Sequence, residues 1–269
     1  MKRHVILFLV VMLLLTGCGK AKPMYTNLAD RASQQEVAQA LEACGISPER
    51  TEQLMEQAED FNTSVQDYRF AGDFRALPQG CVDYSAVVLD DRSEHYEYLQ
   101  CLNCRIAAFH LLKDQLHTAG NGDDRDLWLM FDMEAIDTVP QLRLTGEDRM
   151  DFITVFNQIP VCGTLEAHTQ AITQAWQDRQ IQLDGQGLSL VCVYLHDPDG
   201  KVRFVGHAGV LAESQDGLLF VEKISPMDPF QATRFSSRKE LKAYLLARPD
   251  LYGDLDELEP IVVENGVPL

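Results

Sequence analysis

The chain has 269 residues, a formal net charge of −18 and 46% hydrophobic residues, enough to bury a sizeable core. A chain of this length folds as one large domain or two small ones. Its acidic surface repels nucleic acid, because phosphate contacts need Lys and Arg side chains. The composition therefore excludes nucleic acid as a partner and says nothing about the oligomeric state.

The first residues are typical of a secretory signal. A basic head at Lys2 and Arg3 precedes an apolar run from Val5 to Leu15, and small residues follow the run. The run is well short of the roughly 20 residues that span a bilayer. The letters "LTGC" resemble the lipobox at which bacterial lipoproteins are cleaved and acylated. This resemblance implies a chain that starts at Cys18 and is held by lipid on the outer, extracytoplasmic face of the cell membrane.

Cleavage would remove the signal peptide 1–17, leave 252 residues and change the formal net charge to −20, because Lys2 and Arg3 are lost. We expect a polar tether over 18–32 and a single domain over 33–269. The acidic surface does not adhere to anionic lipid, so the acyl group must supply the membrane attachment. An even number of cysteines remains, which permits disulfides outside the cytoplasm; they are Cys44, Cys81, Cys101, Cys104, Cys162 and Cys192.

Helical signals fill the first part of the chain. Ser33 and Glu36 form a capping box for a helix that ends near residue 45, and Ser47 with Pro48 begins a second helix. The pattern is weak over 62–100, where we assign mostly loop, and it is ambiguous over 127–144. Apolar residues at helical spacing predict three more helices, over about 104–117, from 145 or 148 to 156, and over 164–180.

The period becomes extended after Gly187. Three strands joined by tight turns predict an antiparallel meander over 188–196, 202–211 and 218–224. Ser237 and Glu240 form a second capping box, and 261–263 predicts a last strand. The fold class is therefore α+β, with the helices of 33–180 packed on an antiparallel sheet formed within 187–269.

Cys104 is the first candidate for chemistry. Asn103 is a good N-cap, which places Cys104 in the first turn of its helix. Unpaired backbone N–H groups and the helix dipole favour an anion there, and Arg105 adds a positive charge. These effects lower the pKa of a thiol from about 8.5 toward neutrality and make the nucleophilic thiolate available. The alternative is a buried thiol that packs as a small hydrophobe.

His207 and Glu222 are the other candidates. His207 lies in the small-residue stretch from Gly206 to Gly209, where a substrate or another backbone can approach closely. Glu222 alternates with Leu218 and Phe220 in the next strand and shares their face of the sheet. The hairpin between the two strands makes a contact between His207 and Glu222 feasible. The alternatives are a histidine satisfied by a carbonyl and, if the opposite face is the buried one, a solvated Glu222.

Together these residues resemble the papain-like superfamily of bacterial cell-wall amidases, the NlpC type. Asn103-Cys104 resembles the cysteine at a helix start, His207-Ala208-Gly209-Val210 the histidine strand, and Phe220-Val221-Glu222 the polar residue on the next strand. The resemblance implies a papain-like core with a helical insertion and amide bonds of cell-wall peptides as the substrate. It also implies Cys104 as nucleophile, His207 as general base and Glu222 as the group that orients the imidazole. We expect no cofactor.

The chain beyond the signal also resembles an uncharacterised family of bacterial lipoproteins, DUF4300. The residues that carry this resemblance are Asn103-Cys104-Arg105, Gly206 to Val210, and Glu222-Lys223 with Pro229-Phe230-Gln231. The family names no activity.

Three functional hypotheses follow. The preferred one is a membrane-anchored cysteine hydrolase of amide bonds, in which Asn103, Arg105 and Gly206 support the catalytic residues. The second is a non-catalytic binding or scaffold lipoprotein. The third is a redox protein, because Cys101 and Cys104 form the Cys-x-x-Cys arrangement of thiol–disulfide exchangers. No metal site is expected, because neither a second Cys pair nor a close His pair completes a set of four zinc ligands.

Overall fold

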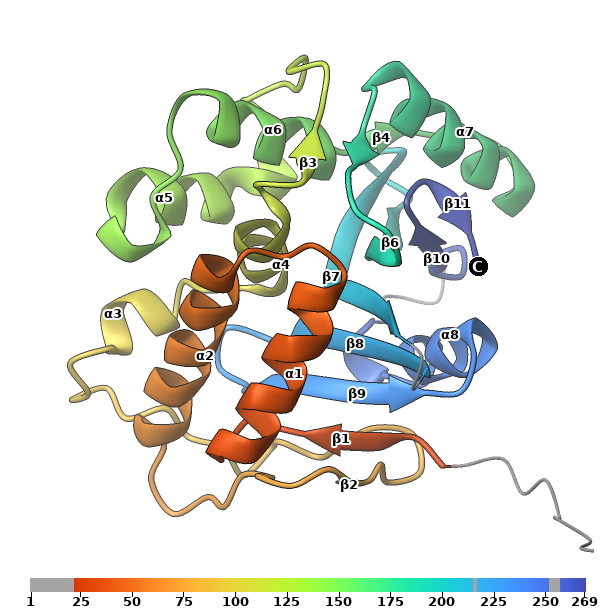
Figure 1. The fold of residues 1–269 in the computed structure, drawn as a ribbon. Coiled ribbons are helices and arrows are strands. Elements are labelled where there is room, and N and C mark those ends of the chain that lie inside the picture. The colour runs from red at the N-terminus through yellow and green to blue at the C-terminus, as the bar shows by residue number, and fades with distance from the viewer. Residues whose placement is uncertain (1–21, 215–216, 252–256) are drawn as a thin grey trace, which may run out of the picture.

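The structure, a computed structural model, describes residues 22–214, 217–251 and 257–269. The predictions for the signal peptide 1–17, the lipobox and the lipidated Cys18 lie outside these ranges. Within the described ranges the chain is α+β, as predicted, with helices packed on a large antiparallel sheet (Figure 1). Among the described helices, none combines the length and the apolar character needed to cross a bilayer.

Most of the helices precede the long strands. The helices are α1 (Arg31–Ala43), α2 (Pro48–Thr63), α3 (Tyr96–Leu99), α4 (Cys104–Leu112), α5 (Met130–Thr138), α6 (Gly146–Phe156), α7 (Leu165–Asp178) and α8 (Arg238–Leu246), with short 3-10 turns η1 (Leu127–Leu129), η2 (Pro140–Leu142) and η3 (Pro249–Leu251). The strands are β1 (Met24–Thr26), β2 (Arg75–Ala76), β3 (Leu116–His117), β4 (Ile159–Pro160), β5 (Gln182–Leu183), β6 (Leu188–Asp197), β7 (Val202–Ser214), β8 (Gly217–Lys223), β9 (Phe230–Phe235), β10 (Ile261–Glu264) and β11 (Val267–Pro268).

Two expectations for the start of the domain are wrong. The segment expected to be a tether includes β1. This strand pairs with β9 and β2, and most of its side chains are buried. The capping box at Ser33 does not form either. Helix α1 begins earlier, and Asp30 is its N-cap, accepting a hydrogen bond from the Ser33 N–H. Asp30 is as good a cap as Ser, so the helix gains one further turn on its N-terminal side.

The predicted meander lies at the centre of the sheet. Within the described ranges, nine strands form this sheet in the order β11-β10-β6-β7-β8-β9-β1-β2, and β4 pairs with β7 beside this path. β6 pairs with β7 along its whole length, and β7 pairs with β8 from Gly209 to Ser214. Strand β9, which the sequence patterns did not predict, extends the meander and joins it to β1.

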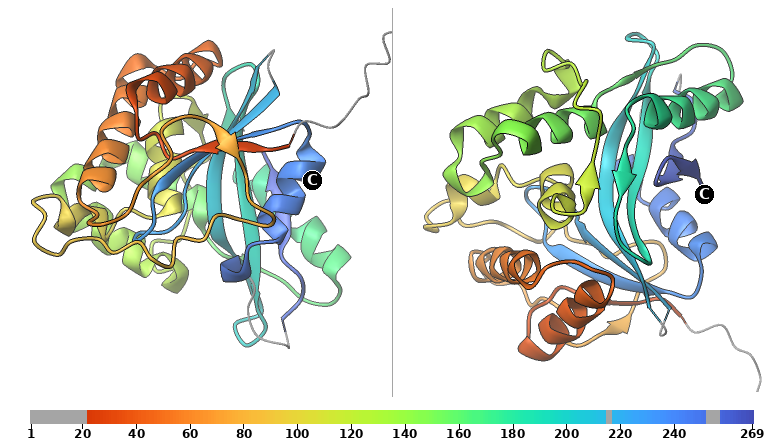
Figure 2. Two further views of the ribbon diagram at one scale, coloured as in Figure 1. Left: turned by 90° about the horizontal axis from the view of Figure 1, so that it is seen from below. Right: turned by 45° about the horizontal axis from the view of Figure 1, so that its top comes forward.

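Both faces of the sheet are buried. Leu219 and Val221 of β8 contribute to a large core with α1, α2 and α4, whereas Leu218 and Phe220 contribute to a smaller core with α8. Figure 2 shows α8 on the opposite side of the strands from α1 and α2. Glu222 continues the series of Leu218 and Phe220, so its side chain enters the core beside α8. It is 2% exposed, and the alternative of a solvated Glu222 is wrong.

An interruption beside β7 positions the candidate site. β4 pairs with β7 at Val202 and Arg203, and β8 pairs with the same side only from Gly209 onward. Among the described strands none occupies that side at residues 204–208, while β6 continues along the other side. The β6 register shifts at Gly206, which makes this glycine the extra residue of a β-bulge. A bulge re-aims the side chain that follows it, and here that side chain is His207.

Gly209 should be intolerant of a side chain. A Cβ atom there would meet the Phe220 ring and would lie 2.9 Å from the Val221 carbonyl oxygen. This oxygen belongs to the backbone of β8, so it cannot easily move away. We predict that Gly209→Ala lowers the free energy of unfolding by about 1–3 kcal/mol, as overpacked core substitutions do. Denaturant unfolding measures this change. Leu127→Ala is the control, because Leu127 is 79% exposed and its loss should change stability by at most about 0.5 kcal/mol.

Candidate functional site

Helix α4 begins at Cys104, as predicted. Asn103 is its N-cap, and the Asn103 side-chain oxygen accepts a hydrogen bond from the Ile106 N–H at 3.0 Å. The helix ends at Leu112, five residues earlier than expected. Its N-terminal turn faces the unoccupied edge of β7, since the Arg105 Nη1 donates to the carbonyl oxygen of Val205 at 2.8 Å. The first turn of α4 therefore takes the place that a neighbouring strand would take.

Asp132 fixes both residues that flank Cys104. The Asn103 Nδ2 donates to Asp132 Oδ1 at 2.8 Å, and the Arg105 Nε donates to the same oxygen at 2.9 Å. A second contact joins the Arg105 Nη2 to Asp132 Oδ2. The Asp132 side chain is fully buried, and charge-assisted hydrogen bonds are the strong ones. Asp132 thus holds the N-terminus of α4 in place from the first turn of α5.

The structure brings together the three residues that the sequence singled out. The His207 Nε2 and the Glu222 Oε2 are 2.6 Å apart. The Cys104 thiol interacts with the His207 ring, which lowers the pKa of Cys104 and raises that of His207, and the Ala208 backbone also lowers the pKa of Cys104. The imidazole of His207 in β7 therefore joins the Cys104 thiol of α4 and the Glu222 carboxylate of β8.

The third predicted supporting residue, Gly206, has a steric role. A Cβ atom there would clash with Leu195 Cδ1, so a larger residue would require the Leu195 side chain to move. Gly206 also remains partly exposed, whereas Cys104, His207 and Glu222 are 9%, 1% and 2% exposed. The side chains of Cys104, His207 and Glu222 are therefore buried, whereas Gly206 reaches the surface.

The electrostatics of the three groups favour charged forms. Burial raises the pKa of the Cys104 thiol, but His207, Arg105 and the Ala208 N–H outweigh burial and bring this pKa below its ordinary value. Burial and Arg248 lower the pKa of His207, whereas Cys104 and Glu222 raise it more strongly, so it lies above its ordinary value. The site therefore favours a thiolate beside an imidazolium, which is the reactive state of a cysteine nucleophile.

Glu222 remains a carboxylate because Tyr244 of α8 and Arg248, just after this helix, are partners for it. The Tyr244 hydroxyl donates to Glu222 Oε1 at 2.7 Å, and the Arg248 Nη1 donates to Glu222 Oε2 at 2.8 Å. Burial alone would raise the pKa of Glu222, but the hydrogen bond with His207 and the charge of Arg248 hold it below its ordinary value. A buried carboxylate without such partners would be costly.

A chain of hydrogen bonds supports Tyr244 from behind. The Gln231 Nε2 donates to the Tyr244 hydroxyl at 2.9 Å, and the Tyr84 hydroxyl donates to Gln231 Oε1 at 2.7 Å. The Asn27 Nδ2 reaches the Tyr84 hydroxyl at 2.6 Å. All four side chains are buried. The orientation of Glu222 thus depends on residues from the loop after β1, the segment before α3, and β9 and α8.

The comparisons with known proteins identify the family. The model of the family described as "Domain of unknown function (DUF4300)" matches residues 24–269. This chain belongs to the DUF4300 family. No curated protein and no solved structure matches it. The matched range begins at β1 and contains every residue of the site described above, so the site is part of the DUF4300 domain itself.

The other cysteines of the DUF4300 domain do not join the site through hydrogen bonds. All six described cysteines are unpaired, Cys101 and Cys104 included. Cys101 is half-buried, and burial raises its pKa, whereas the Cys104 thiol interacts with His207. Among the described residues, no group of three or more His, Cys, Asp or Glu side chains is arranged to hold a metal ion.

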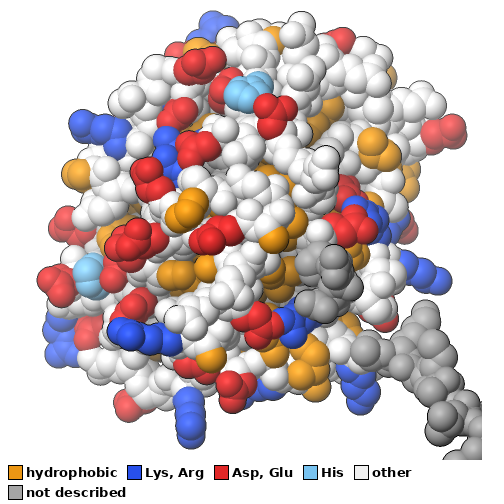
Figure 3. Space-filling model, viewed as in Figure 1, with side chains coloured by type: hydrophobic (Ala, Val, Ile, Leu, Met, Phe, Trp, Pro, Cys, Tyr) orange, Lys and Arg blue, Asp and Glu red, His pale blue; other side chains and the backbone are white. Residues whose placement is uncertain are grey.

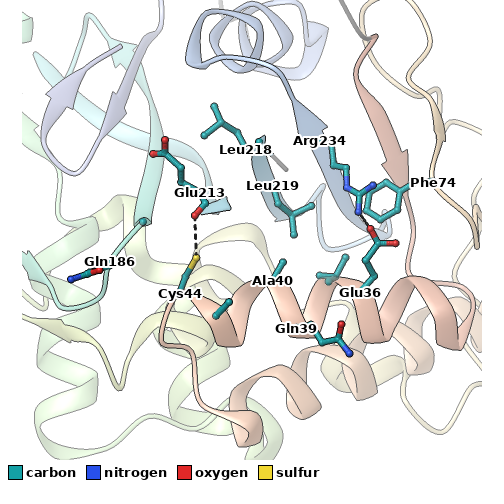
Figure 4. A pocket seen from close by; sticks show the side chains of 14 residues that line it. Glu36, Gln39, Ala40, Cys44, Phe74, Gln186, Glu213, Leu218, Leu219 and Arg234 are labelled. Carbon is teal, nitrogen blue, oxygen red and sulfur yellow. Dashed lines mark hydrogen bonds and ion pairs between the residues drawn. The ribbon is translucent and has the colours of Figure 1, made fainter. Parts of the chain in front are cut away.

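A groove of about 650 Å³ lies elsewhere on the DUF4300 domain (Figure 4). It runs between α1 and strands β7, β8 and β9, with Leu218 and Leu219 on one wall and Ala40 on the other. Arg234 stacks over the Phe74 ring and pairs with Glu36 at one end. None of the residues that line this groove is Cys104, His207 or Glu222. The groove and the cluster of Cys104, His207 and Glu222 are therefore separate features of the domain.

Sequence reasoning missed three residues of the site: Asp132, Tyr244 and Arg248. Asp132 falls in the stretch 127–144, whose periodicity was ambiguous. Tyr244 lies in the helix predicted after Ser237, at helical spacing with buried leucines, and reads as an ordinary core residue. Arg248 follows that helix, where a basic residue is common because it suits the helix dipole. No spacing in the sequence links any of the three to Cys104.

The Asp132 anchor gives a testable difference between two ion pairs. We predict that Asp132→Asn lowers the free energy of unfolding by about 2 kcal/mol, because it leaves the Arg105 guanidinium without its buried counter-charge. Asp137→Asn is the matched control. Asp137 pairs with Arg149 in a similar two-bond geometry, but its side chain is 46% exposed, so its loss should cost at most about 1 kcal/mol. Equal effects in denaturant unfolding would contradict the anchoring role of Asp132.

Proposed function

We propose that this DUF4300 protein is a lipid-anchored, extracytoplasmic cysteine hydrolase that cleaves amide bonds. The observation that carries the proposal is that the His207 ring hydrogen-bonds to Glu222 and interacts with the Cys104 thiol, so one imidazole joins the two groups. A nucleophile, a base and a group that orients the base are the three parts that acyl transfer by a cysteine enzyme requires. The three residues lie on α4, β7 and β8, and all three are buried.

The reaction begins with the thiolate of Cys104. It attacks the carbonyl carbon of the substrate amide and forms a C–S bond, and the carbonyl electrons move onto oxygen. The imidazolium of His207 then donates its proton to the departing amine as the C–N bond breaks. A thioester on Cys104 remains. His207, now neutral, removes a proton from water, and the resulting hydroxide attacks the thioester and releases the acid and the thiolate.

Two further features support this chemistry. The backbone N–H of Cys104 belongs to the first turn of α4, where N–H groups have no partner within the helix, and it would donate to the developing oxyanion. Glu222 would accept a hydrogen bond from the Nε2–H of His207 and so fix both the tautomer and the orientation of the ring. The carboxylate also stabilises the imidazolium that each half of the reaction needs.

The surface charge limits the substrate. Asp and Glu side chains are spread over the face shown in Figure 3, and the whole chain carries a net charge of −18. A polyanionic substrate would be repelled from such a surface. Peptides of the cell wall, which the resemblance to NlpC-type amidases implies, offer amide bonds outside the membrane and remain the preferred substrate class.

Covalent trapping tests the proposed chemistry. We expect a peptide that carries an electrophilic carbonyl group to add to Cys104 and to no other cysteine, and mass spectrometry of the digested protein locates the adduct. Cys104→Ala should abolish the adduct, and His207→Ala should slow its formation by at least about 100-fold, because general base catalysis contributes about that much. Cys162→Ala is the control, since this exposed cysteine has no partner in the site. Labelling that follows exposure, with Cys162 modified first and Cys104 inert in the folded protein, would overturn the proposal.

One observation favours a second function, that of a non-catalytic binding or scaffold lipoprotein. The Cys104 residue is only 9% exposed, and the groove of about 650 Å³ does not reach it. In that case the Cys104–His207–Glu222 contacts would serve stability alone. An inert Cys104 in the trapping experiment supports this reading, and a Cys101–Cys104 disulfide in the non-reduced protein supports the redox alternative.

The anchor is tested separately from the chemistry. We predict that Cys18→Ala removes the lipid, so that the protein leaves the membrane fraction when expressed in a bacterium with its own signal. The reason is that a chain with this acidic surface has no electrostatic attraction to anionic membranes, and the acyl group is the source of attachment. Fractionation and mass measurement of the N-terminal peptide check this outcome. A variant that stays in the membrane fraction would contradict lipid anchoring at this residue.

A further inference from the structure

Arg248 contacts both members of the His207–Glu222 pair. Its Nη1 lies 2.8 Å from Glu222 Oε2 and 3.1 Å from His207 Nε2. The 2.6 Å contact with the Glu222 carboxylate requires a proton on Nε2, because a carboxylate can only accept. The Arg248 guanidinium therefore lies beside the ring as a charge and does not donate to Nε2. The Arg248 residue is 2% exposed. A buried positive charge at this distance from a titrating imidazole acts on it strongly, because little water screens it.

Glu222 and Arg248 act on His207 with opposite signs. The Glu222 carboxylate stabilises the imidazolium, and the Arg248 guanidinium destabilises it. Without Arg248, the buried carboxylate would hold the proton on His207 more tightly, and the ring would return from imidazolium to neutral base only at higher pH. With Arg248 present, the two neighbouring charges partly cancel at the ring. This partial cancellation favours a ring that can both donate and accept a proton, as a general acid and base must.

Arg248 is itself held in position. Its Nη2 donates to Asp250 Oδ2 at 2.6 Å and to the Ile224 carbonyl oxygen at 3.2 Å, and its Nε donates to Asp250 Oδ1 at 3.2 Å. The contact with Ile224 ties the guanidinium to the residue just after β8, and Asp250 pairs with it from η3. Asp250 is half exposed, so water screens its charge more than that of Glu222.

We propose that Arg248 is a positioning residue of the candidate site, which holds the Glu222 carboxylate in place and offsets its charge at His207. The inference rests on the proposed function, because it assigns a role in a site that exchanges protons between Cys104 and His207. It goes beyond that function in naming a fourth side chain, and it makes the protonation of His207 the property that Arg248 controls.

Other charged or titratable groups also act on this cluster. They come from every element packed around it: Arg105 on α4, Cys192 on β6, Lys223 on β8, Tyr244 on α8, Asp250 on η3, and Cys81 and Tyr84 on the segment between β2 and α3. None of these groups, all within the described residues, forms a hydrogen bond or ion pair with both His207 and Glu222, as the Arg248 guanidinium does. Its removal is therefore the change that isolates the effect.

The test is a pH titration of the His207 ring by NMR of its ring nitrogens, with His207→Gln used to assign the signal. We expect Arg248→Met to raise the midpoint of the His207 titration by about one pH unit, because an adjacent positive charge is lost. Arg248→Lys keeps the charge and should restore a midpoint near that of the wild type. Glu222→Gln removes the opposite charge and should lower the midpoint. A purely structural Arg248 would not move the midpoint in this charge-dependent order.

An unchanged or lowered midpoint in a folded Arg248→Met protein overturns the inference. If that variant does not fold, Arg248→Gln takes its place, because it is also neutral and can still donate to the Ile224 carbonyl; an unmoved midpoint there has the same meaning. Failure of the proposed function looks different. In that case the wild-type His207 titration is the same with and without the Cys104 thiol, as Cys104→Ser would show, whatever the Arg248 variants do.

Discussion

The ionised Glu222 side chain, buried in the core between the sheet and α8, is the constraint on which the site depends. A carboxylate removed from water must be met by donors or positive charge. Here the donors are His207 from the neighbouring strand, Tyr244 from α8 and Arg248 from just beyond it. Meeting this need fixes the imidazole at one end and docks α8 at the other, so one requirement sets both the local geometry and part of the tertiary packing.

The second requirement is space for a thiol next to that imidazole. In a continuous sheet the edge of β7 would be covered by a strand, and a helix N-terminus could not reach it. Here strand pairing is interrupted between β4 and β8. The Arg105 side chain donates to the Val205 carbonyl oxygen there, and Cys104 interacts with His207. The bulge at Gly206 turns the histidine toward this gap. The candidate site thus depends on the gap in strand pairing along β7, between its partners β4 and β8.

Local patterns in the sequence predicted most of this arrangement. The N-cap at Asn103 and the period-two strands around His207 and Glu222 are properties of neighbouring residues, so the helix start and the contact across the hairpin could be expected from them. The burial of Glu222 could not, because alternation tells which residues share a face and not what covers it. The partners Asp132 and Arg248 lie 27 and 26 residues away from the side chains they hold. Such pairings follow from how the elements pack, as does the pairing of β1, a strand of only three residues.

The central claim is that Cys104 is a thiolate and His207 an imidazolium in the resting protein, with the proton on the ring. Ultraviolet absorbance of the thiolate, recorded against pH for the wild type and for Cys104→Ala, measures this directly and needs neither a substrate nor access of a reagent to sulfur. The difference between the two proteins should show a thiolate already present at neutral pH and lost only in acid. A difference that develops at or above the ordinary thiol pKa of about 8.5 would contradict the account, because Cys104 would then be a buried thiol and nothing more.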